Sequence, residues 1–228
     1  MKLIAAGCSF IFGNELSDTN NDQDPSQLTF SALLADYLNL EYQCVAVPGT
    51  GSDTISRQVI KNFDYSTKFV LVCWSYAGRF EFNFKDHDWQ GIRHLSNHPE
   101  LKNCTEPFSK MFYANLTKTY QWYNYVKDIV FLQQWLKSKK VPYLFCSVDP
   151  DFTQDVIDQT EYVELYKSID WQPWFFWKFN NRNVGFVQWT ANNQVNNNDF
   201  KIGKIAKHPL EYAHQQTFEQ IKKTLTWY

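Results

Sequence analysis

Apolar residues fall into two kinds of pattern along the chain, short continuous runs and longer stretches with apolar positions three or four residues apart. The continuous runs predict strands at residues 2–6, 42–47, 68–74 and 141–148, with a fifth, short strand at residues 185–189. The spaced patterns predict helices at residues 29–38, 52–63, 116–139 and 210–227. Strand and helix therefore alternate through most of the sequence.

This alternation predicts an α/β fold, because strands separated by helices join through right-handed crossovers into a parallel sheet. We expect a three-layer α/β/α sandwich with a flavodoxin-like sheet of about five strands. The chain has 228 residues and no evident linker, which fits one domain spanning 1–228. Around 79–113 and 151–200 the periodicity is lost, and we expect irregular insertions there, the first of them over the carboxyl edge of the sheet.

Charge and composition limit which partners and which cellular location we expect for this protein. The net charge of −2 favours no polyanion, so we expect no nucleic-acid partner. No stretch is long and apolar enough to cross a membrane, and the apolar run after Lys2 is too short for a secretory signal, so we expect a cytoplasmic protein. The five cysteines form no CxxC pair, which favours reduced, buried thiols.

Candidate chemistry gathers where the predicted strands end. Ser9 follows the first strand in Gly7-Cys8-Ser9, Gly49 follows the second, and Ser75 follows the third. Because the carboxyl ends of parallel strands share one rim, we expect these residues to lie close together. His208 precedes the last helix and can reach the same rim. A serine and a histidine placed in this way form a candidate nucleophile and base.

The ordered set resembles the SGNH/GDSL hydrolase family, in short blocks spread over the whole chain. Gly7-Cys8-Ser9 resembles the first block, with Cys8 in place of the usual aspartate. Residues 46–52 resemble the second block, and His208-Pro209, followed by His214, resembles the last. The resemblance implies a serine hydrolase of the esterase type that needs no metal or cofactor. It also implies an oxyanion hole that includes Gly49.

Two family positions are not matched. The third block lacks its asparagine, since this chain has Trp74-Ser75-Tyr76, and the aspartate three residues before the histidine is replaced by Ile205. We expect the N–H groups of Ser9 and Gly49 to line the oxyanion hole, with the Ser75 hydroxyl either joining them or simply ending its strand. A backbone carbonyl or the distant Asp199 is expected to orient His208.

Each assignment has a plainer alternative. Ser9 alone is equally a serine in a tight turn, and His208 is otherwise a histidine that caps a helix. Cys8 is the other possible nucleophile, although adjacent side chains in a strand-end turn point differently, which favours burial. His214 lies inside the last helix and is expected to pack or to bond locally.

The remaining candidates concern the substrate. Trp74, Tyr76 and Arg79 are expected to contact it, although Arg79 and Glu81 at alternate positions more simply pair with each other. The aromatic cluster at 171–179 is a hydrophobic plug or an interface for a homo-oligomer, and otherwise a stacking platform for sugars. The three histidines at 87, 94 and 98 match no zinc signature, so we expect no metal site.

Together these features predict an esterase that cleaves an O-acyl ester of a small molecule or a carbohydrate. The acyl-enzyme would form on Ser9, with His208 as base and then acid. The alternative is a catalytically impaired protein of the same fold that serves as a carbohydrate-binding or assembly module, which would bind glycan equally well as Ser9→Ala. A nucleotide-binding protein is disfavoured, because neither GxGxxG nor a phosphate-loop lysine is present.

Overall fold

A parallel sheet forms the centre of the molecule in the computed structural model, which describes residues 1–19, 23–83, 89–92, 106–149, 162–195, 197–204 and 208–225. The strand order is β2-β1-β3-β6 and every pairing is parallel. The strands are β1 (Lys2–Ala6), β2 (Glu41–Cys44), β3 (Thr67–Trp74) and β6 (Tyr143–Ser147). The predicted parallel sheet is confirmed, and three of its strands follow the predicted bounds to within two residues.

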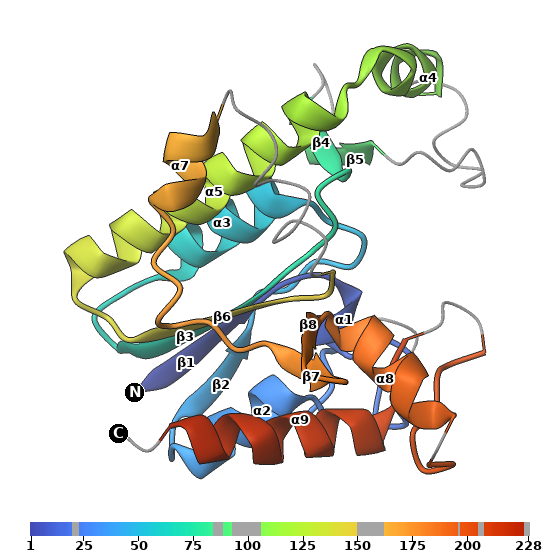
Figure 1. Cartoon of the computed structure of the whole chain (residues 1–228). Coiled ribbons are helices and arrows are strands. Elements are labelled where there is room, and N and C mark those ends of the chain that lie inside the picture. The colour runs from blue at the N-terminus through green and yellow to red at the C-terminus, as the bar shows by residue number, and fades with distance from the viewer. Residues whose placement is uncertain are drawn as a thin grey trace.

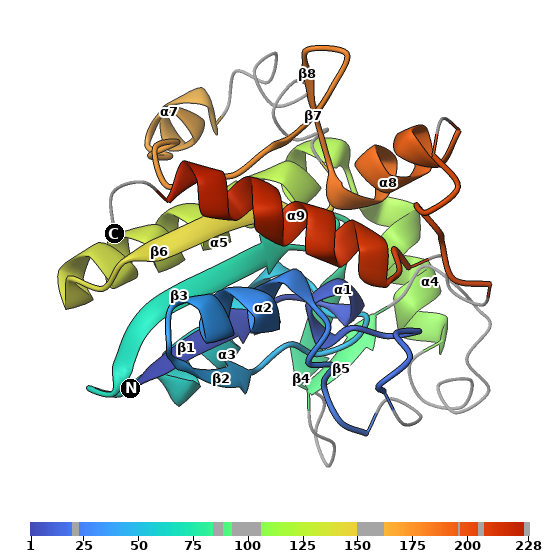
Figure 2. The same ribbon diagram turned by 90° about the horizontal axis from the view of Figure 1, so that it is seen from below.

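Helices cover both faces of the sheet, as the alternating pattern predicted (Figure 1). One face carries α2 and α9, and the other carries α3 and α5. Figure 2 shows α9 alongside α2, both on the same face of the sheet. The bounds are α2 (Phe30–Tyr37), α3 (Ser52–Asn62), α5 (Lys118–Lys139) and α9 (Glu211–Thr224). The molecule is therefore a three-layer α/β/α sandwich.

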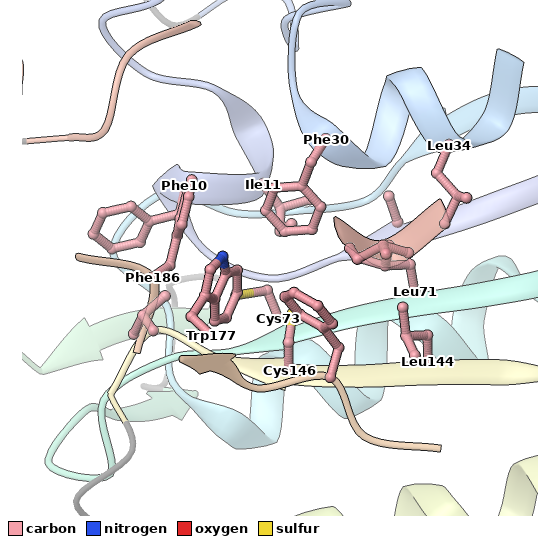
Figure 3. Close-up of a cluster of buried hydrophobic side chains, with 14 of the residues drawn as sticks. Phe10, Ile11, Phe30, Leu34, Leu71, Cys73, Leu144, Cys146, Trp177 and Phe186 are labelled. Atoms are coloured by element: carbon pink, nitrogen blue, oxygen red, sulfur yellow. The ribbon is translucent and has the colours of Figure 1, made fainter. Parts of the chain in front are cut away.

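Two apolar clusters, one on each side of the sheet, form the core because successive strand residues point to opposite faces. Leu71 and Cys73 of β3 belong to the cluster beneath α2 and α9, whereas Val72 and Trp74 belong to the cluster beneath α3 and α5. Figure 3 shows the first cluster, where Phe30 of α2 lies close to aromatic side chains from the carboxyl-terminal third of the chain. The core thus joins the two ends of the sequence.

The expected fifth strand at residues 185–189 is wrong, because this segment is the start of helix α8 (Phe186–Gln194). The side chain of Gln188 accepts a hydrogen bond from the N–H of Gly185 at 3.1 Å, which caps the helix. The aromatic run after Gly185 looks like a strand, but Phe186 and Trp189 pack on one helical face, and both are buried.

A different segment extends the sheet beside β6. Phe145 donates its N–H to Pro173 O at 2.8 Å, and Phe175 donates to Phe145 O at 2.8 Å, which makes a single parallel bridge. Within the aromatic cluster, Trp174, Phe175 and Trp177 are buried. Three of the six aromatic side chains of the cluster therefore fill space against the sheet, as a hydrophobic plug does, and a homo-oligomer through it stays a prediction.

Shorter helices and strands form in the regions where the sequence loses its periodic pattern. The segment after β3 forms the antiparallel hairpin β4–β5, and the segment before α8 forms a second hairpin, β7–β8. Figure 1 shows β4, β5 and α8 towards the end of the sheet that also carries the short helix α1. The bounds are α1 (Ser9–Phe12), β4 (Phe80–Asn83), β5 (Trp89–Ile92), α4 (Glu106–Asn115), α7 (Val163–Lys167), β7 (Trp177–Phe179) and β8 (Arg182–Val184). Within the described ranges, no helix is long and apolar enough to cross a membrane.

Candidate active site

Ser9 lies at the carboxyl end of β1, on the first turn of α1. The chain turns sharply at Gly7, where a Cβ atom would lie 2.6 Å from Ile11 Cγ1 and 2.9 Å from the carbonyl oxygen of Cys73. Only glycine therefore lets the chain pass this close to β3. Gly13, with φ 87°, ends the short helix in the left-handed region. The sequence after β1 thus builds a rigid turn that holds the serine at the rim.

His208 reaches Ser9 from the far end of the chain. The imidazole Nε2 lies 2.7 Å from Ser9 Oγ, and both residues are buried. The backbone of His208 is held by a short antiparallel contact, in which its carbonyl accepts the N–H of Gly203 at 2.7 Å. The ring of Phe10 packs edge-on at 5.0 Å. The two residues that sequence analysis chose as nucleophile and base are therefore directly hydrogen-bonded.

The other ring nitrogen of His208 contacts a carboxylate that sequence analysis missed. Glu15 Oε2 lies 2.8 Å from His208 Nδ1 and also accepts the backbone N–H of His208 at 3.2 Å. The two side chains are only 14% and 9% exposed. Glu15 follows Gly13 in the turn after α1, at a φ of 69°. The three side chains thus form a continuous serine–imidazole–carboxylate chain.

The expectation that a backbone carbonyl or Asp199 orients His208 is wrong. Asp199 is exposed, and its N–H is bonded within its own loop to Asn197 Oδ1 at 2.9 Å. A carboxylate reaches Nδ1 instead, from 193 residues away in sequence. The sequence did not indicate Glu15, because in the family that it resembles the acid lies three residues before the histidine, where this chain has Ile205. An acidic residue in the glycine-bearing turn six positions after Ser9 was the available signal.

Gly203 makes the space that Glu15 occupies. A Cβ atom built on Gly203 would overlap the carboxylate carbon and both oxygens of Glu15. No side chain larger than hydrogen therefore fits there without moving the carboxylate. The strand-like contact that holds His208 also closes over Glu15, so one local structure fixes the imidazole and its carboxylate partner.

Two other strand ends border the serine. Gly49 lies in the turn after β2 with a φ of 80°, a conformation that favours glycine. The chain leading into this turn is tied to the end of β1, since Val47 donates its N–H to Gly7 O at 3.1 Å. The N–H of Ser9 has no acceptor within its own helix, because it belongs to the first turn. Both groups that were expected to line an oxyanion hole are thus at the rim.

Ser75 follows β3 and is fully buried. Its Oγ accepts a hydrogen bond from Arg79 Nη1 at 2.8 Å. The guanidinium carbon of Arg79 lies 4.8 Å above the ring of Tyr76. A backbone bend therefore folds residues 75–79 back on themselves at the end of β3, with Arg79 directed at the buried serine.

Two expectations in this segment are wrong. Arg79 and Glu81 do not pair within the part of the chain that the structure describes, because Glu81 accepts bonds from Thr50 and from Arg57, the latter at 3.1 Å. Trp74 is not placed to contact a substrate, since it is fully buried and packs on Tyr125 and other rings beneath α5. Alternation along β3 turns its side chain away from the face that carries Ser9.

His214 and Cys8 lie beside the site without joining it. His214 Nδ1 accepts the N–H of Phe30, the first residue of α2, at 3.2 Å, and the two rings stack. Burial first, and then the neighbouring His208, lower the pKa of His214 to about 3, so its ring stays neutral. Cys8 is fully buried next to Ser9. Local packing is therefore the role of His214, as expected.

No group of three or more metal-ligating side chains occurs among the described residues. The three histidines at 87, 94 and 98, for which no metal was expected, lie outside those residues. The described site consists of a serine, an imidazole, a carboxylate and backbone N–H groups. A serine, an imidazole and a carboxylate arranged in this order are groups that can perform nucleophilic attack and proton transfer.

Comparison with solved structures identifies the fold. TesA aligns over 99% of this chain and 98% of its own at a TM-score of 0.51 and 11% identity. A carbohydrate esterase family 2 enzyme with a carbohydrate-binding domain, from Corynascus thermopiles (Myceliophthora fergusii), aligns at a TM-score of 0.50 and 12% identity, over 98% of this chain and 64% of its own. A family two carbohydrate esterase from Clostridium thermocellum, solved with cellohexaose, aligns at 0.50 and 14%, over 100% and 65%.

These likenesses show that the chain has the SGNH/GDSL-hydrolase fold, as its short sequence blocks predicted. The chain spans about two thirds of the length of the two carbohydrate esterases. No protein-family model matches the sequence, and no curated protein matches it. The conserved feature is thus the architecture, at identities of 11–14%.

Proposed function

We propose that this protein is a serine hydrolase that cleaves O-acyl esters, with Ser9 as nucleophile, His208 as general base and acid, and Glu15 as the residue that orients the imidazole. The observation that carries the proposal is the hydrogen-bonded chain from Ser9 Oγ through both ring nitrogens of His208 to Glu15, at 2.7 and 2.8 Å. Serine is a weak nucleophile and needs an adjacent base to attack a carbonyl.

Glu15 fixes which nitrogen of His208 carries the proton. Because a carboxylate accepts at Nδ1, the neutral ring holds its proton there and leaves the lone pair of Nε2 facing Ser9 Oγ. The carboxylate also stabilises the imidazolium that forms when the serine proton moves to Nε2. The missing family aspartate is therefore replaced in function by a residue from the opposite end of the chain.

The reaction then has two halves. Ser9 Oγ attacks the ester carbonyl as its proton passes to His208 Nε2, and His208 gives that proton to the departing alcohol, leaving an acyl-serine. A water molecule then gives a proton to Nε2 and attacks the acyl carbonyl. Collapse returns the proton to Ser9 Oγ and releases the carboxylic acid. No metal or organic cofactor enters either half.

Negative charge on the carbonyl oxygen is stabilised by the N–H groups of Ser9 and Gly49. Ser75 was the third candidate for this role, but it is fully buried, and its Oγ accepts a hydrogen bond from Arg79 Nη1 at 2.8 Å. We therefore assign Ser75 to holding Arg79 at the end of β3, which leaves two backbone donors for the oxyanion.

We propose an acylated carbohydrate as the substrate, in line with the two family two carbohydrate esterases that share the fold. The aromatic cluster at 171–179 gives little support, since its central rings are buried. The alternative function is a carbohydrate-binding or assembly module without catalysis. The complete Ser9–His208–Glu15 chain argues against it, because a binding module needs no oriented base.

A serine-reactive fluorophosphonate tests the proposal directly. Wild-type protein should gain one adduct by intact mass, and Ser9→Ala and His208→Ala should gain none. Cys8→Ala is the matched control, because it removes the adjacent candidate nucleophile and should still label. Labelling that survives in Ser9→Ala, or no labelling of folded wild type, would contradict the hydrolase. Glycan binding that is unchanged in Ser9→Ala, together with no labelling, would favour the binding module.

A further inference from the structure

Arg79 lies on the same rim as the proposed nucleophile. The strand that precedes Ser9 pairs directly with the strand that precedes Ser75, with Ala6 opposite Val72. Arg79 donates to Ser75 Oγ, so its guanidinium is anchored at the end of β3. Tyr76, over which the guanidinium lies, packs against the buried cluster that contains Cys8. A cation is therefore fixed one strand away from Ser9.

This cation has no carboxylate partner within the described ranges. The nearest acidic residue in sequence, Glu81, is 7% exposed and bonded to Arg57 and Thr50. Glu15 is occupied by both N–H groups of His208. Buried and half-buried charges are ordinarily paired, because removing a charge from water is unfavourable. Among the residues that the structure describes, the half-buried guanidinium of Arg79 thus has only neutral neighbours, the Ser75 hydroxyl and the rings of Tyr76 and Tyr113.

The neighbours of Arg79 keep the place open for an anion. The guanidinium carries five N–H donors in a planar fork, and the described bond to Ser75 uses only one of its groups. Burial raises the pKa of Tyr76 to about 12 despite the opposing effect of Arg79, so the phenol stays neutral and does not neutralise the cation. The backbone is fixed as well, because the carbonyl of Arg79 packs against Gly51, where a Cβ would overlap it.

We propose that Arg79 binds an anionic group of the substrate, so that the site selects acyl esters carrying a carboxylate near the ester to be cleaved. This inference rests on the proposed hydrolase function and names its substrate class. An arginine fork suits a carboxylate, because two parallel N–H···O bonds fix both its position and its plane. Bound in this way, the anion would hold the ester carbonyl next to Ser9.

The carboxylate can come from either side of the ester, and two substrate pairs distinguish the sources. On the acyl side, 4-nitrophenyl hemisuccinate is compared with 4-nitrophenyl butyrate. On the alcohol side, an O-acetylated glucuronic acid is compared with its neutral methyl ester. The measured quantity is the ratio of kcat/KM for the charged ester to that for the neutral one, in wild type and in Arg79→Gln.

We expect a wild-type ratio of roughly tenfold to a hundredfold for one of the two pairs, the range of a hydrogen bond to a charged group. Arg79→Gln should bring that ratio to about one, chiefly through KM, and Arg79→Lys should retain part of it. Arg182→Gln is the matched control, since it removes the same charge from the exposed residue that begins β8 and should leave the ratio unchanged.

The ratio of kcat/KM values tests the role of Arg79 separately from the hydrolase activity itself. Hydrolysis of neutral esters with no preference for charged ones in either pair, or a preference that persists in Arg79→Gln, overturns the role of Arg79 and leaves the hydrolase standing. A second measurement needs no turnover: Ser9→Ala should bind the charged ester in calorimetry, and Ser9→Ala with Arg79→Gln should bind it at least tenfold more weakly. Equal binding by these two variants also overturns it.

Discussion

Two sides of one rim differ in how far the protein satisfies its own polar groups. The serine side, consisting of Ser9, His208 and Glu15, is closed, since each side chain is bonded to the next at 2.7–2.8 Å. The arginine side, consisting of Ser75, Tyr76 and Arg79, is open, because among the described residues its cation has neutral neighbours, the hydroxyl of Ser75 and the rings of Tyr76 and Tyr113, and no carboxylate partner. A closed chain is preorganised for proton transfer. An open cation is suited to a ligand that brings its own charge.

The difference has a structural origin. The serine side is assembled from both ends of the sequence, with the turn after α1 and the segment before α9 held by backbone bonds. The arginine side comes from one stretch that folds back after β3. Long-range assembly around Gly203 leaves little room for movement, whereas the arginine side is a single local bend in which the guanidinium contacts Ser75 and Tyr76. In the proposed function, chemistry and substrate choice are thus assigned to separate parts of the rim.

The largest expected effect comes from breaking the serine side with Glu15→Gln. The amide keeps the size of the side chain but removes the charge that fixes the tautomer of His208 and stabilises its protonated form. A loss of about 10⁴ in kcat is expected, as for the corresponding change in a serine protease. The preference for charged over neutral esters should survive, because it belongs to the arginine side. Steady-state kinetics on one charged and one neutral ester measure both.

Glu15→Asp is the control for this change, because it keeps the charge on a shorter side chain and should lose less than Glu15→Gln. Circular dichroism would confirm that both variants are folded. A kcat within tenfold of wild type for Glu15→Gln would mean that the carboxylate only holds the loop, and the closed chain would then have no catalytic meaning.

The sequence predicted the parts of this rim that depend on local pattern. Apolar runs and helix- or strand-breaking residues predicted the strand before Ser9, the turn at Gly49 and the helix after His208. The resemblance to the SGNH/GDSL family then indicated that these elements form one site. Glu15 was not predictable in this way. Its partner lies 193 residues away, and nothing in a polar loop distinguishes a carboxylate that bonds a buried histidine from a solvated one.

The errors have the same cause. Arg79 and Glu81 are neighbours in sequence, but the tertiary structure gives Glu81 to Arg57 of α3 instead. The segment at 185–189 has the composition of a strand, yet packing of Phe186 against Phe30 and Trp177 fits it as a helix. In each case a long-range contact overrides a local preference, which a single sequence does not record.

A smaller loss of turnover is expected when the Glu15 carboxylate is displaced while the residue itself stays the same. In Gly203→Ala the added methyl group would overlap the carboxylate, so Glu15 must shift away from His208 Nδ1. A displacement of about 1 Å can reduce turnover about a hundredfold. The preference for charged esters should again be unchanged. The measurement is kcat for a neutral ester at saturating concentration.

Gly78→Ala is the matched control on the arginine side. The nearest atom to its Cβ would be Gln121 Oε1 at 3.5 Å, an ordinary contact, so the methyl group fits. Its kcat should stay close to that of wild type. If Gly203→Ala were equally active, Glu15 would be free to adapt, and the serine side would not be the rigid half of the comparison.

The smallest expected effect concerns stability, and it involves the histidine that does no chemistry. His214 has a pKa lowered to about 3 in the folded protein, first by burial and then by His208, against about 6.5 when unfolded. Between these values the unfolded state binds a proton that the folded state does not, so the free energy of unfolding falls as pH falls. The slope from this residue is about 1.4 kcal/mol per pH unit.

His214→Gln isolates this contribution, because the amide oxygen can still accept the N–H of Phe30 while carrying no titratable group. Urea unfolding between pH 4 and pH 6.5 should give wild type a steeper loss of stability than the variant, by about 1.4 kcal/mol per pH unit. Parallel curves would mean that the imidazole titrates normally within the fold. The core beneath the serine side would then tolerate a protonated histidine. Water would therefore reach the serine side more readily than its contacts indicate.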